Sequence, residues 1–126
     1  CLGMQLLCSR SEEGSLPGLG WIEADVVRFR FPPGSSLKIP HMGWNTVRVA
    51  KANPLIPADG EAQRYYFVHS YHAVCRDAAD VLATTSHGGD VTAAVSRDNV
   101  MGVQFHPEKS HRFGMALMRR FVELPC

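Results

Sequence analysis

The order of apolar and polar residues along the chain predicts a series of β-strands with a helical segment at each end. Residues 1–8 (CLGMQLLC) place leucine and methionine among good helix formers. In residues 21–31 (WIEADVVRFRF), Val27, Phe29 and Phe31 alternate with arginines, which is the period of a half-buried strand.

More strands are predicted from aromatic and β-branched residues, and turns from glycine and proline. Extended segments are expected over residues 37–49 (interrupted by Gly43), 65–74, 81–89, 90–96 and 100–106. Turns or loops are expected over residues 32–36, 52–62 and 97–99. From residue 109 to 124 the pattern is helical, and the apolar side of that helix is formed by Phe113, Leu117, Phe121 and Leu124. Many strands between two helices predict an α/β or α+β fold.

Composition and charge narrow the possible functions. The 126 residues are enough for one domain, and 45% hydrophobic with 20% charged residues is typical of a globular protein. Because 13 basic and 12 acidic residues give a formal net charge of +1, nucleic acid is not expected as a partner. No apolar run approaches the roughly 18 residues that cross a bilayer, and no signal peptide is visible, so we expect no membrane association.

The cysteines suit a reducing cytoplasm, which is the predicted location. They lie far apart, without a C-x-x-C pair, at Cys1, Cys8, Cys75 and Cys126. This spacing indicates neither a disulfide framework nor a zinc ribbon, and no metal is expected. Since the chain begins with cysteine, it is either processed or the downstream piece of something longer.

The strand over residues 100–106 ends in two titratable residues separated by a proline. Strand alternation places Gln104 and His106 on one face. Pro107 biases His106 towards an extended conformation, so Glu108 is expected on the same side as His106. Its carboxylate could then accept the imidazole N–H, as in a nucleophile–base–acid triad. The alternative is a surface pair that merely ends the strand.

Cys1 is the candidate nucleophile for such a triad. The start C-L-G, followed by a helical pattern, is similar to the second half of a G-x-C-x-G nucleophile elbow. Gly3 would permit close packing at the turn, and a helix N-terminus favours the thiolate form of the sulfur. The backbone N–H of Leu2 is the natural oxyanion donor, and Gln5 lies on the same helix face as Cys1. The alternative is that Cys1 is only a cut end.

The other histidines do not form a convincing metal site. His69, His72 and Cys75 read as H-x-x-H-x-x-C, but an odd offset on one strand puts the two histidines on opposite faces. The remaining three lie in loop-like segments and are expected to be solvated or local hydrogen-bond partners: His41, His87 and His111. Trp44, beside Asn45, is either a core residue or an exposed contact residue.

Two motifs together resemble the class I, triad-type glutamine amidotransferases: C-L-G-M-Q at the start and V-Q-F-H-P-E-K-S near the end. I-P-H-M-G-W-N and Y-Y-F-V-H-S-Y-H narrow the resemblance to the glutaminase subunit of imidazole glycerol phosphate synthase, in histidine biosynthesis. The resemblance covers essentially all of residues 1–126. It implies a flavodoxin-like, three-layer α/β domain and no cofactor.

The resemblance implies glutamine hydrolysis by a Cys-His-Glu triad. Cys1 would be the nucleophile, His106 the general base and then acid, and Glu108 the group that orients it. The thiolate attacks the side-chain amide carbon of L-glutamine and ammonia leaves. Water then hydrolyses the thioester to give glutamate.

The same resemblance assigns the remaining site residues. Leu2 would supply the oxyanion donor, and the substrate would lie among Gly3, Gln5, Ser70 and Tyr71. Family members pass the ammonia to a (β/α)₈ cyclase subunit, which makes imidazole glycerol phosphate, so the implied partner is this subunit in a heterodimer. The positions expected at that interface are Trp44, Asn45 and Lys109.

The chain departs from the family pattern before Cys1. Family domains begin well upstream, with strands of the central sheet and a glycine-containing loop that completes the oxyanion hole. Residues 1–126 are therefore interpreted as the C-terminal part of one amidotransferase domain, beginning at the nucleophile elbow. Losing an oxyanion donor typically costs about 10²–10³ in rate. Losing core strands would also leave the remaining sheet faces uncovered, so we expect this chain alone to be inactive and poorly folded.

Three other interpretations remain open. An N-terminal nucleophile hydrolase would use the α-amine of Cys1 as its base, and acetylating that amine would abolish its activity. A triad amidotransferase could serve another synthase, although P-H-M-G-W-N argues against this. A non-catalytic, amidotransferase-like binding module would have no need of an intact triad.

Overall fold

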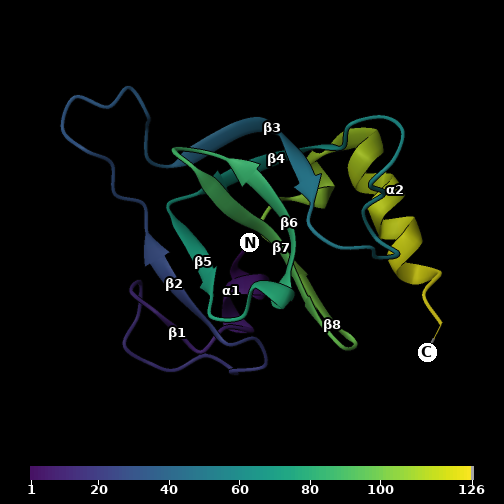
Figure 1. The fold of residues 1–126 in the computed structure, drawn as a ribbon, viewed down its shortest axis with the longest axis horizontal. Coiled ribbons are helices and arrows are strands. Elements are labelled where there is room, and N and C mark those ends of the chain that lie inside the picture. Colours follow the sequence, from purple (N-terminus) through teal and green to yellow (C-terminus); the bar gives the residue numbers. More distant parts are fainter. Residues whose placement is uncertain (126) are drawn as a thin grey trace.

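The computed structural model describes residues 1–125, which form two β-sheets and two α-helices (Figure 1). The helices are α1 (Leu2–Leu6) and α2 (His111–Val122), with short 3₁₀ turns at η1 (Ala78–Asp80) and η2 (Pro107–Lys109). The strands are β1 (Arg10–Ser11), β2 (Ala24–Arg28), β3 (His41–Val49), β4 (Arg64–His69), β5 (Tyr71–Cys75), β6 (Val81–Ser86), β7 (Asp90–Arg97) and β8 (Val100–Val103). A mixed fold with many strands agrees with the predicted fold class.

The smaller sheet has the order β1-β2-β5, and the larger has the order β4-β3-β6-β7-β8. Only the β1–β2 pair is parallel among the described strand pairs; the others are antiparallel. In Figure 1 the smaller sheet and α2 lie on opposite sides of the view, with the larger sheet between them. One apolar cluster joins the larger sheet to Leu117 of α2, and a second joins α1 to β2 and β5.

The segment over residues 65–74, predicted as one strand, is two strands that belong to different sheets. β4 pairs with β3 in the larger sheet, whereas β5 pairs with β2 in the smaller one. The chain bends at Ser70, whose carbonyl accepts the backbone N–H of Phe29 at 3.0 Å. Ser70 is therefore a corner that joins the two sheets, and aromatic content alone gave no sign of it.

The predicted strand over residues 21–31 is shorter than expected, and its alternation changes phase. Ala24 and Val26 are buried in β2, so Val27 is only half-buried, contrary to the prediction. β2 ends at Arg28, after which Phe29 is buried. Because the chain leaves the sheet there, the residues before and after Arg28 do not share one register.

Two other expectations about local structure are corrected. Gly43 does not interrupt β3, which continues through it with a φ of +120°. Phe113 on α2 and Leu124, just after the helix ends, pack against the core around Leu117, but Phe121 is 52% exposed. The apolar side of α2 is therefore narrower than the sequence pattern suggested.

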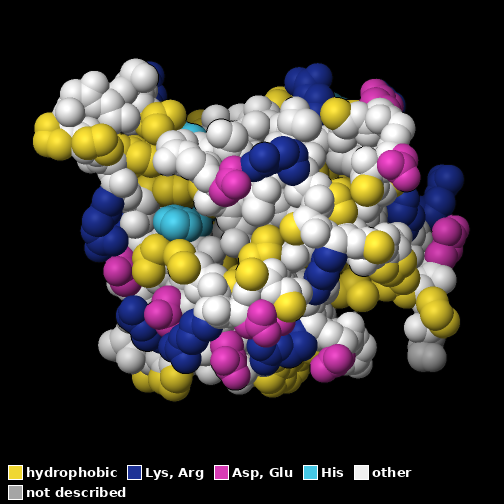
Figure 2. Space-filling model, in the orientation of Figure 1, with side chains coloured by type: hydrophobic (Ala, Val, Ile, Leu, Met, Phe, Trp, Pro, Cys, Tyr) yellow, Lys and Arg dark blue, Asp and Glu magenta, His cyan; other side chains and the backbone are white. Residues whose placement is uncertain are grey.

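Surface charge agrees with the balanced composition. Figure 2 shows Lys and Arg side chains interspersed with Asp and Glu over this face of the molecule. Within residues 1–125, no helix is both long enough and apolar enough to cross a membrane. The cytoplasmic location stays a prediction.

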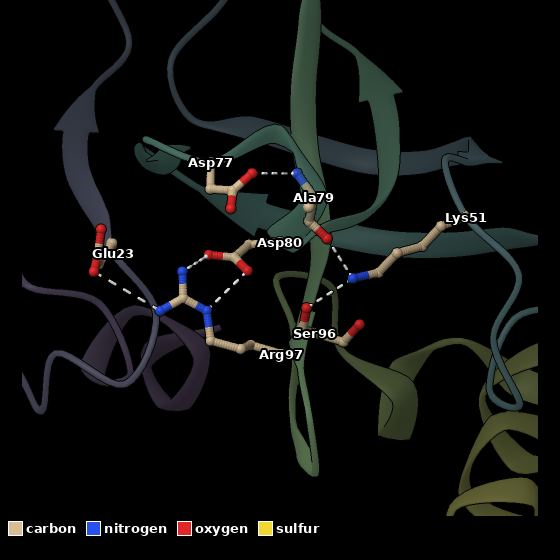
Figure 3. A network of polar contacts seen from close by, with 7 residues as sticks. All are labelled: Glu23, Lys51, Asp77, Ala79, Asp80, Ser96 and Arg97. Atoms are coloured by element: carbon tan, nitrogen blue, oxygen red, sulfur yellow. Dashed lines mark hydrogen bonds and ion pairs between the residues drawn. The ribbon is translucent and has the colours of Figure 1, made fainter.

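A polar network holds η1, the second link between the sheets, against β7 (Figure 3). Arg97 donates to both carboxylate oxygens of buried Asp80, at 3.0 and 2.7 Å, and lies 3.9 Å from Glu23. Lys51 donates to the carbonyl of Ser96 at 2.8 Å. Because a buried carboxylate needs such partners, the network fixes the place where the chain passes from β5 to β6.

Helix α2 is seated on η2 by a close approach at Gly114. A Cβ at this position would lie 1.8 Å from the carbonyl oxygen of Pro107, which is closer than any real contact. Gly114 therefore allows α2 to touch the backbone of the turn that carries Glu108.

Replacing Gly114 by alanine should lower the free energy of unfolding by about 1–3 kcal/mol, because the backbone must shift to relieve the clash. This loss should exceed the gain of about 1 kcal/mol in helix propensity. Gly14→Ala is the control, since a Cβ there meets nothing within 4 Å and the change should be within about 0.5 kcal/mol. Urea denaturation of the full-length protein measures both, and equal stability of the Gly114 variant and the parent would contradict this account.

Candidate active site

Cys1 lies at the N-terminus of α1, against the end of β8. Its thiol sulfur accepts a hydrogen bond from Gln104 Nε2 at 3.2 Å and lies 3.9 Å from the carbonyl oxygen of Val68. Its backbone nitrogen donates to the carbonyl of Val103 at 3.1 Å.

His106 and Glu108 form the hydrogen-bonded pair that the sequence predicted. His106 Nδ1 lies 2.8 Å from Glu108 Oε1, although the chain turns into η2 at Pro107 where an extended path was expected. The hydrogen bond from His106, followed by those from the Glu108 backbone, lowers the pKa of the Glu108 carboxyl. The contact therefore arises from a turn, and the strand geometry used to predict it was wrong.

The second imidazole nitrogen of His106 is available to a ligand or nucleophile. Among residues 1–125, His106 Nε2 is buried and has no hydrogen-bond partner, so it is not bonded to the Cys1 thiol in this structure. A neutral imidazole that donates from Nδ1 carries a lone pair on Nε2. Catalytic hydrogen bonds are often formed only when substrate is bound. Nε2 can therefore act as a base.

A cavity of about 500 Å³ opens beside Cys1. Four residues predicted for the site line it: Cys1, Gln5, Ser70 and Tyr71. The sequence gave no sign of the others: Glu13, Arg28, Pro40, Val68 and His69. Glu13 lies in a loop and Arg28 at the end of β2, where charged residues are ordinary. Only the packing of the two sheets brings them to the cavity.

Gln104 is a further site residue that motif reasoning passed over. It is completely buried, and its Oε1 accepts a hydrogen bond from Gln5 Nε2 at 3.2 Å. The same Gln5 nitrogen donates to the carbonyl of Tyr71, also at 3.2 Å. Strand alternation had placed Gln104 on the face of His106, and that placement was the available signal.

Leu2 and Gly3 lie on the exposed part of α1. The N–H of Leu2 belongs to the first helical turn, where backbone donors have no intrahelical partner, so it can donate to an oxyanion. A Cβ at Gly3 would meet nothing within 4 Å among the described residues. The close packing predicted at Gly3 is therefore not seen, and its place in the substrate site stays a prediction.

A buried histidine pair lies next to this cavity. His41 Nδ1 and His69 Nε2 are 2.9 Å apart, and His69 Nδ1 lies 2.8 Å from the carbonyl oxygen of Tyr71. A carbonyl can only accept, so His69 donates to Tyr71, His41 donates to His69, and His41 Nε2 accepts from Asn45 at 3.2 Å. His41 was expected to be solvated or a local hydrogen-bond partner. It is buried and bonds to Asn45, four residues along the chain, and it also meets His69 because β3 begins at His41 and pairs it with His69.

The corner at Ser70 overturns the argument that placed His69 and His72 on opposite faces of one strand. His69 and His72 both pack on Phe29, with ring centroids 5.3 and 4.5 Å away, so the argument from opposite faces of one strand fails. His87, expected to be solvated or a local hydrogen-bond partner, lies 2.9 Å from the carbonyl oxygen of Lys38, which is 49 residues away in the chain. Within residues 1–125, no three His, Cys, Asp or Glu side chains are arranged to hold a metal ion.

The described cysteines carry free thiols: Cys1, Cys8 and Cys75. Burial raises the pKa of Cys8 to about 11, and burial also raises the pKa of Cys75. Both are therefore poor nucleophiles near neutral pH. Cys126 lies outside the described residues.

Two of the predicted interface residues share an exposed surface, and the third faces away from it. Trp44 is 41% exposed, and its ring lies 6.4 Å from that of Tyr66. The Lys109 ammonium lies over the same Tyr66 ring, 6.0 Å from the ring centroid. Asn45, the next residue along β3, instead donates to the carbonyl of Ser86 at 2.8 Å and to His41. Asn45 therefore has a structural role in the histidine pair.

A thiol, an imidazole paired with a carboxylate, and a polar cavity are parts that a thiol-dependent amide hydrolase uses. Residues 1–124 match the model of the family described as "Glutamine amidotransferase class-I". The chain belongs to the class I glutamine amidotransferases. This membership confirms the predicted resemblance and its fold class.

Curated relatives carry a more specific name. The "Imidazole glycerol phosphate synthase subunit HisH 2" of Pseudomonas aeruginosa is 54% identical over 124 residues, which is 98% of this chain and 60% of that protein. A protein of the same name from Methanococcus maripaludis is 52% identical over 123 residues, with the same two shares. The HisH subunit of Leptospira borgpetersenii is 51% identical over 125 residues, 98% of this chain and 61% of that protein. The chain thus spans about 60% of the length of these relatives.

Acid should destabilise the fold through the His41–His69 pair. The ordinary pKa of both histidines is 6.5, whereas burial lowers that of His41 to about 4 and that of His69 to about 3. Between the lowered pKa values and 6.5, the unfolded chain binds more protons than the folded one. The contribution of the pair to the free energy of unfolding is therefore fully present above pH 6.5 and is lost as the pH decreases. The free energy of unfolding should fall by about 1 kcal/mol per pH unit for each histidine between pH 6 and 5.

Urea denaturation of the full-length protein at pH 7, 6 and 5 measures this slope. His41→Phe keeps an aromatic ring in the stack and removes one titrating group, so its slope should be flatter by about 1 kcal/mol per pH unit. Exposed Met42→Leu on the same strand is the control, because it removes no titrating group and should keep the parent slope. A His41→Phe variant with the parent slope would exclude the pair as the cause.

Proposed function

We propose that this chain carries the glutamine-hydrolysing centre of an imidazole glycerol phosphate synthase in histidine biosynthesis. The observation that carries the proposal is the His106–Glu108 pair, in which the buried Nε2 of His106 has no partner among the described residues. Two residues before His106, in the same motif, Gln104 donates a hydrogen bond to the sulfur of Cys1. Family membership and the names of the relatives support the same function. We further propose that residues 1–126 form part of a single amidotransferase domain.

In the proposed mechanism, His106 Nε2 takes the thiol proton of Cys1 and the thiolate attacks the side-chain amide carbon of glutamine. The oxyanion accepts a hydrogen bond from the backbone N–H of Leu2. The imidazolium gives its proton to the amide nitrogen, which leaves as ammonia. Glu108 stabilises the imidazolium and holds its tautomer. Water, deprotonated by His106, then attacks the thioester and releases glutamate and the Cys1 thiol.

The lining of the cavity suits an amino acid substrate. Glu13 and Arg28 contribute opposite charges, which complement the ammonium and carboxylate groups of free glutamine. Ser70 and Tyr71 add polar groups to the same lining. We assign these four residues to the amino-acid end of the substrate, with the reacting amide placed at Cys1.

For the cyclase partner, we propose the surface around Trp44, Tyr66 and Lys109. An exposed tryptophan flanked by a tyrosine and cations has the composition of an interface hot spot. Arg64 lies 6.0 Å over the Trp44 ring, and the His111 ring lies 5.5 Å from it. Ammonia released at Cys1 would pass to the partner and be used for imidazole glycerol phosphate.

Glutamate release by the full-length protein, with and without a nucleotide-loaded cyclase subunit, tests the reaction. Cys1→Ser should reduce the rate by on the order of 10³ or more, and His106→Asn by about 10²–10⁴, the usual contribution of a general base. Glu123→Gln changes a carboxylate outside the described site and should leave the rate unchanged. Full activity in Cys1→Ser would refute the triad, and activity indifferent to the cyclase would favour another synthase.

Trp44→Ala should weaken cyclase binding about 30-fold, equivalent to about 2 kcal/mol, if Trp44 is a hot spot. Titration calorimetry of the two full-length subunits measures this constant. Met115→Ala on α2 is the control, because Met115 is apolar and more exposed than Trp44, at 70% against 41%, but lies on another element. Equal affinities for Trp44→Ala and the parent would remove this surface from the proposed interface.

A further inference from the structure

A chain of three hydrogen bonds runs from a backbone carbonyl to the sulfur of Cys1. Gln5 Nε2 donates to the Tyr71 carbonyl and to Gln104 Oε1, each at 3.2 Å, and Gln104 Nε2 lies 3.2 Å from Cys1 Sγ. Gln104 is completely buried. A buried amide that lacks partners costs free energy, so the sulfur is one of the groups that satisfy Gln104.

The direction of this chain follows from its first member. A backbone carbonyl can only accept, so the atom of Gln5 that faces Tyr71 must be its amide nitrogen. That nitrogen also reaches Gln104, and the atom of Gln104 that it meets must therefore be the carbonyl oxygen. The remaining atom of the Gln104 amide is its NH₂ group, which consequently faces Sγ. No other orientation of the two amides satisfies all three contacts.

An N–H donor aimed at sulfur favours the charged thiolate over the thiol. Hydrogen bonds to an ionised acceptor are about twice as strong as those between neutral groups, and a thiol sulfur is a weak acceptor. The thiolate is the nucleophile of the first step and the leaving group of the second. A donor fixed at Sγ can therefore assist both steps.

We propose that Gln104 is a catalytic residue that donates a hydrogen bond to the Cys1 thiolate, and that Gln5 is a positioning residue that orients the Gln104 amide. The catalytic part of this inference rests on the proposed glutaminase function. It also changes the role expected of Gln5, because both donors of its amide are used within the protein. Only Gln5 Oε1 remains to face the substrate.

The test is the pH profile of Cys1 alkylation by iodoacetamide in the full-length protein, followed by mass spectrometry. Gln104→Met conserves volume and removes the donor, so the midpoint should rise by about one pH unit, with about tenfold slower alkylation below it. Gln5→Met should shift the midpoint in the same direction by less. Gln63→Met is the matched control, because Gln63 is a buried glutamine that donates to Glu61 and lies outside the cavity lining.

A folded Gln104→Met variant with the parent midpoint overturns the inference. If that variant does not fold, the side-chain NH₂ resonance of Gln104 in the unaltered protein decides. It should titrate with the same midpoint as alkylation, and a resonance that does not respond overturns the inference as well.

Glutamate release separates this inference from the proposed function. Alkylation needs no turnover, so an unaltered protein that releases no glutamate disproves the glutaminase function while the thiol measurement still stands. Conversely, an active enzyme in which Gln104→Met changes neither kcat nor the alkylation midpoint disproves only the role of Gln104.

Discussion

The carbonyl oxygen of Tyr71 accepts two hydrogen bonds, and the geometry of the candidate site depends on them. One comes from Gln5 and fixes the amide of Gln104 at the sulfur of Cys1. The other comes from His69 and fixes the tautomers of the buried histidine pair. A carbonyl oxygen has two lone pairs, so both chains of donors can end on one atom. The corner at Ser70 makes this possible by turning Tyr71 away from β4 and into the smaller sheet.

The imidazole half of the site is held by a different set of contacts. The carbonyl of His106 accepts a hydrogen bond from the Ser110 hydroxyl at 2.6 Å, and the same hydroxyl accepts the backbone N–H of Tyr66 at 3.0 Å. Gly114 then seats α2 on the turn between His106 and Ser110. The backbone on both sides of the imidazole is thus fixed, while Nε2 stays free to meet a proton. Rigid support with one open position is what a general base requires.

Sequence reasoning was most successful for contacts between residues that are close together in the chain. The pairing of His106 with Glu108 needs only two residues of separation, and Gln5 was placed beside Cys1 from helix periodicity. It did not foresee that β3 buries His41 or that the chain changes sheet at Ser70. A strand that changes sheets keeps the same aromatic and β-branched composition on both sides of the corner, and pairing partners such as His41 and His69 are 28 residues apart.

By itself, the sequence determined the family, the presence of strands between two helices, and the residues of the proposed triad, because local periodicity and motif spacing carry that information. Only the tertiary structure decided which side chains share the cavity. Glu13 and Arg28 line the cavity beside Cys1, and Gln104 donates to its sulfur, because segments far apart in the chain come together. Such contacts depend on how two sheets pack and on which buried polar groups must find partners, and no local pattern of residues encodes either.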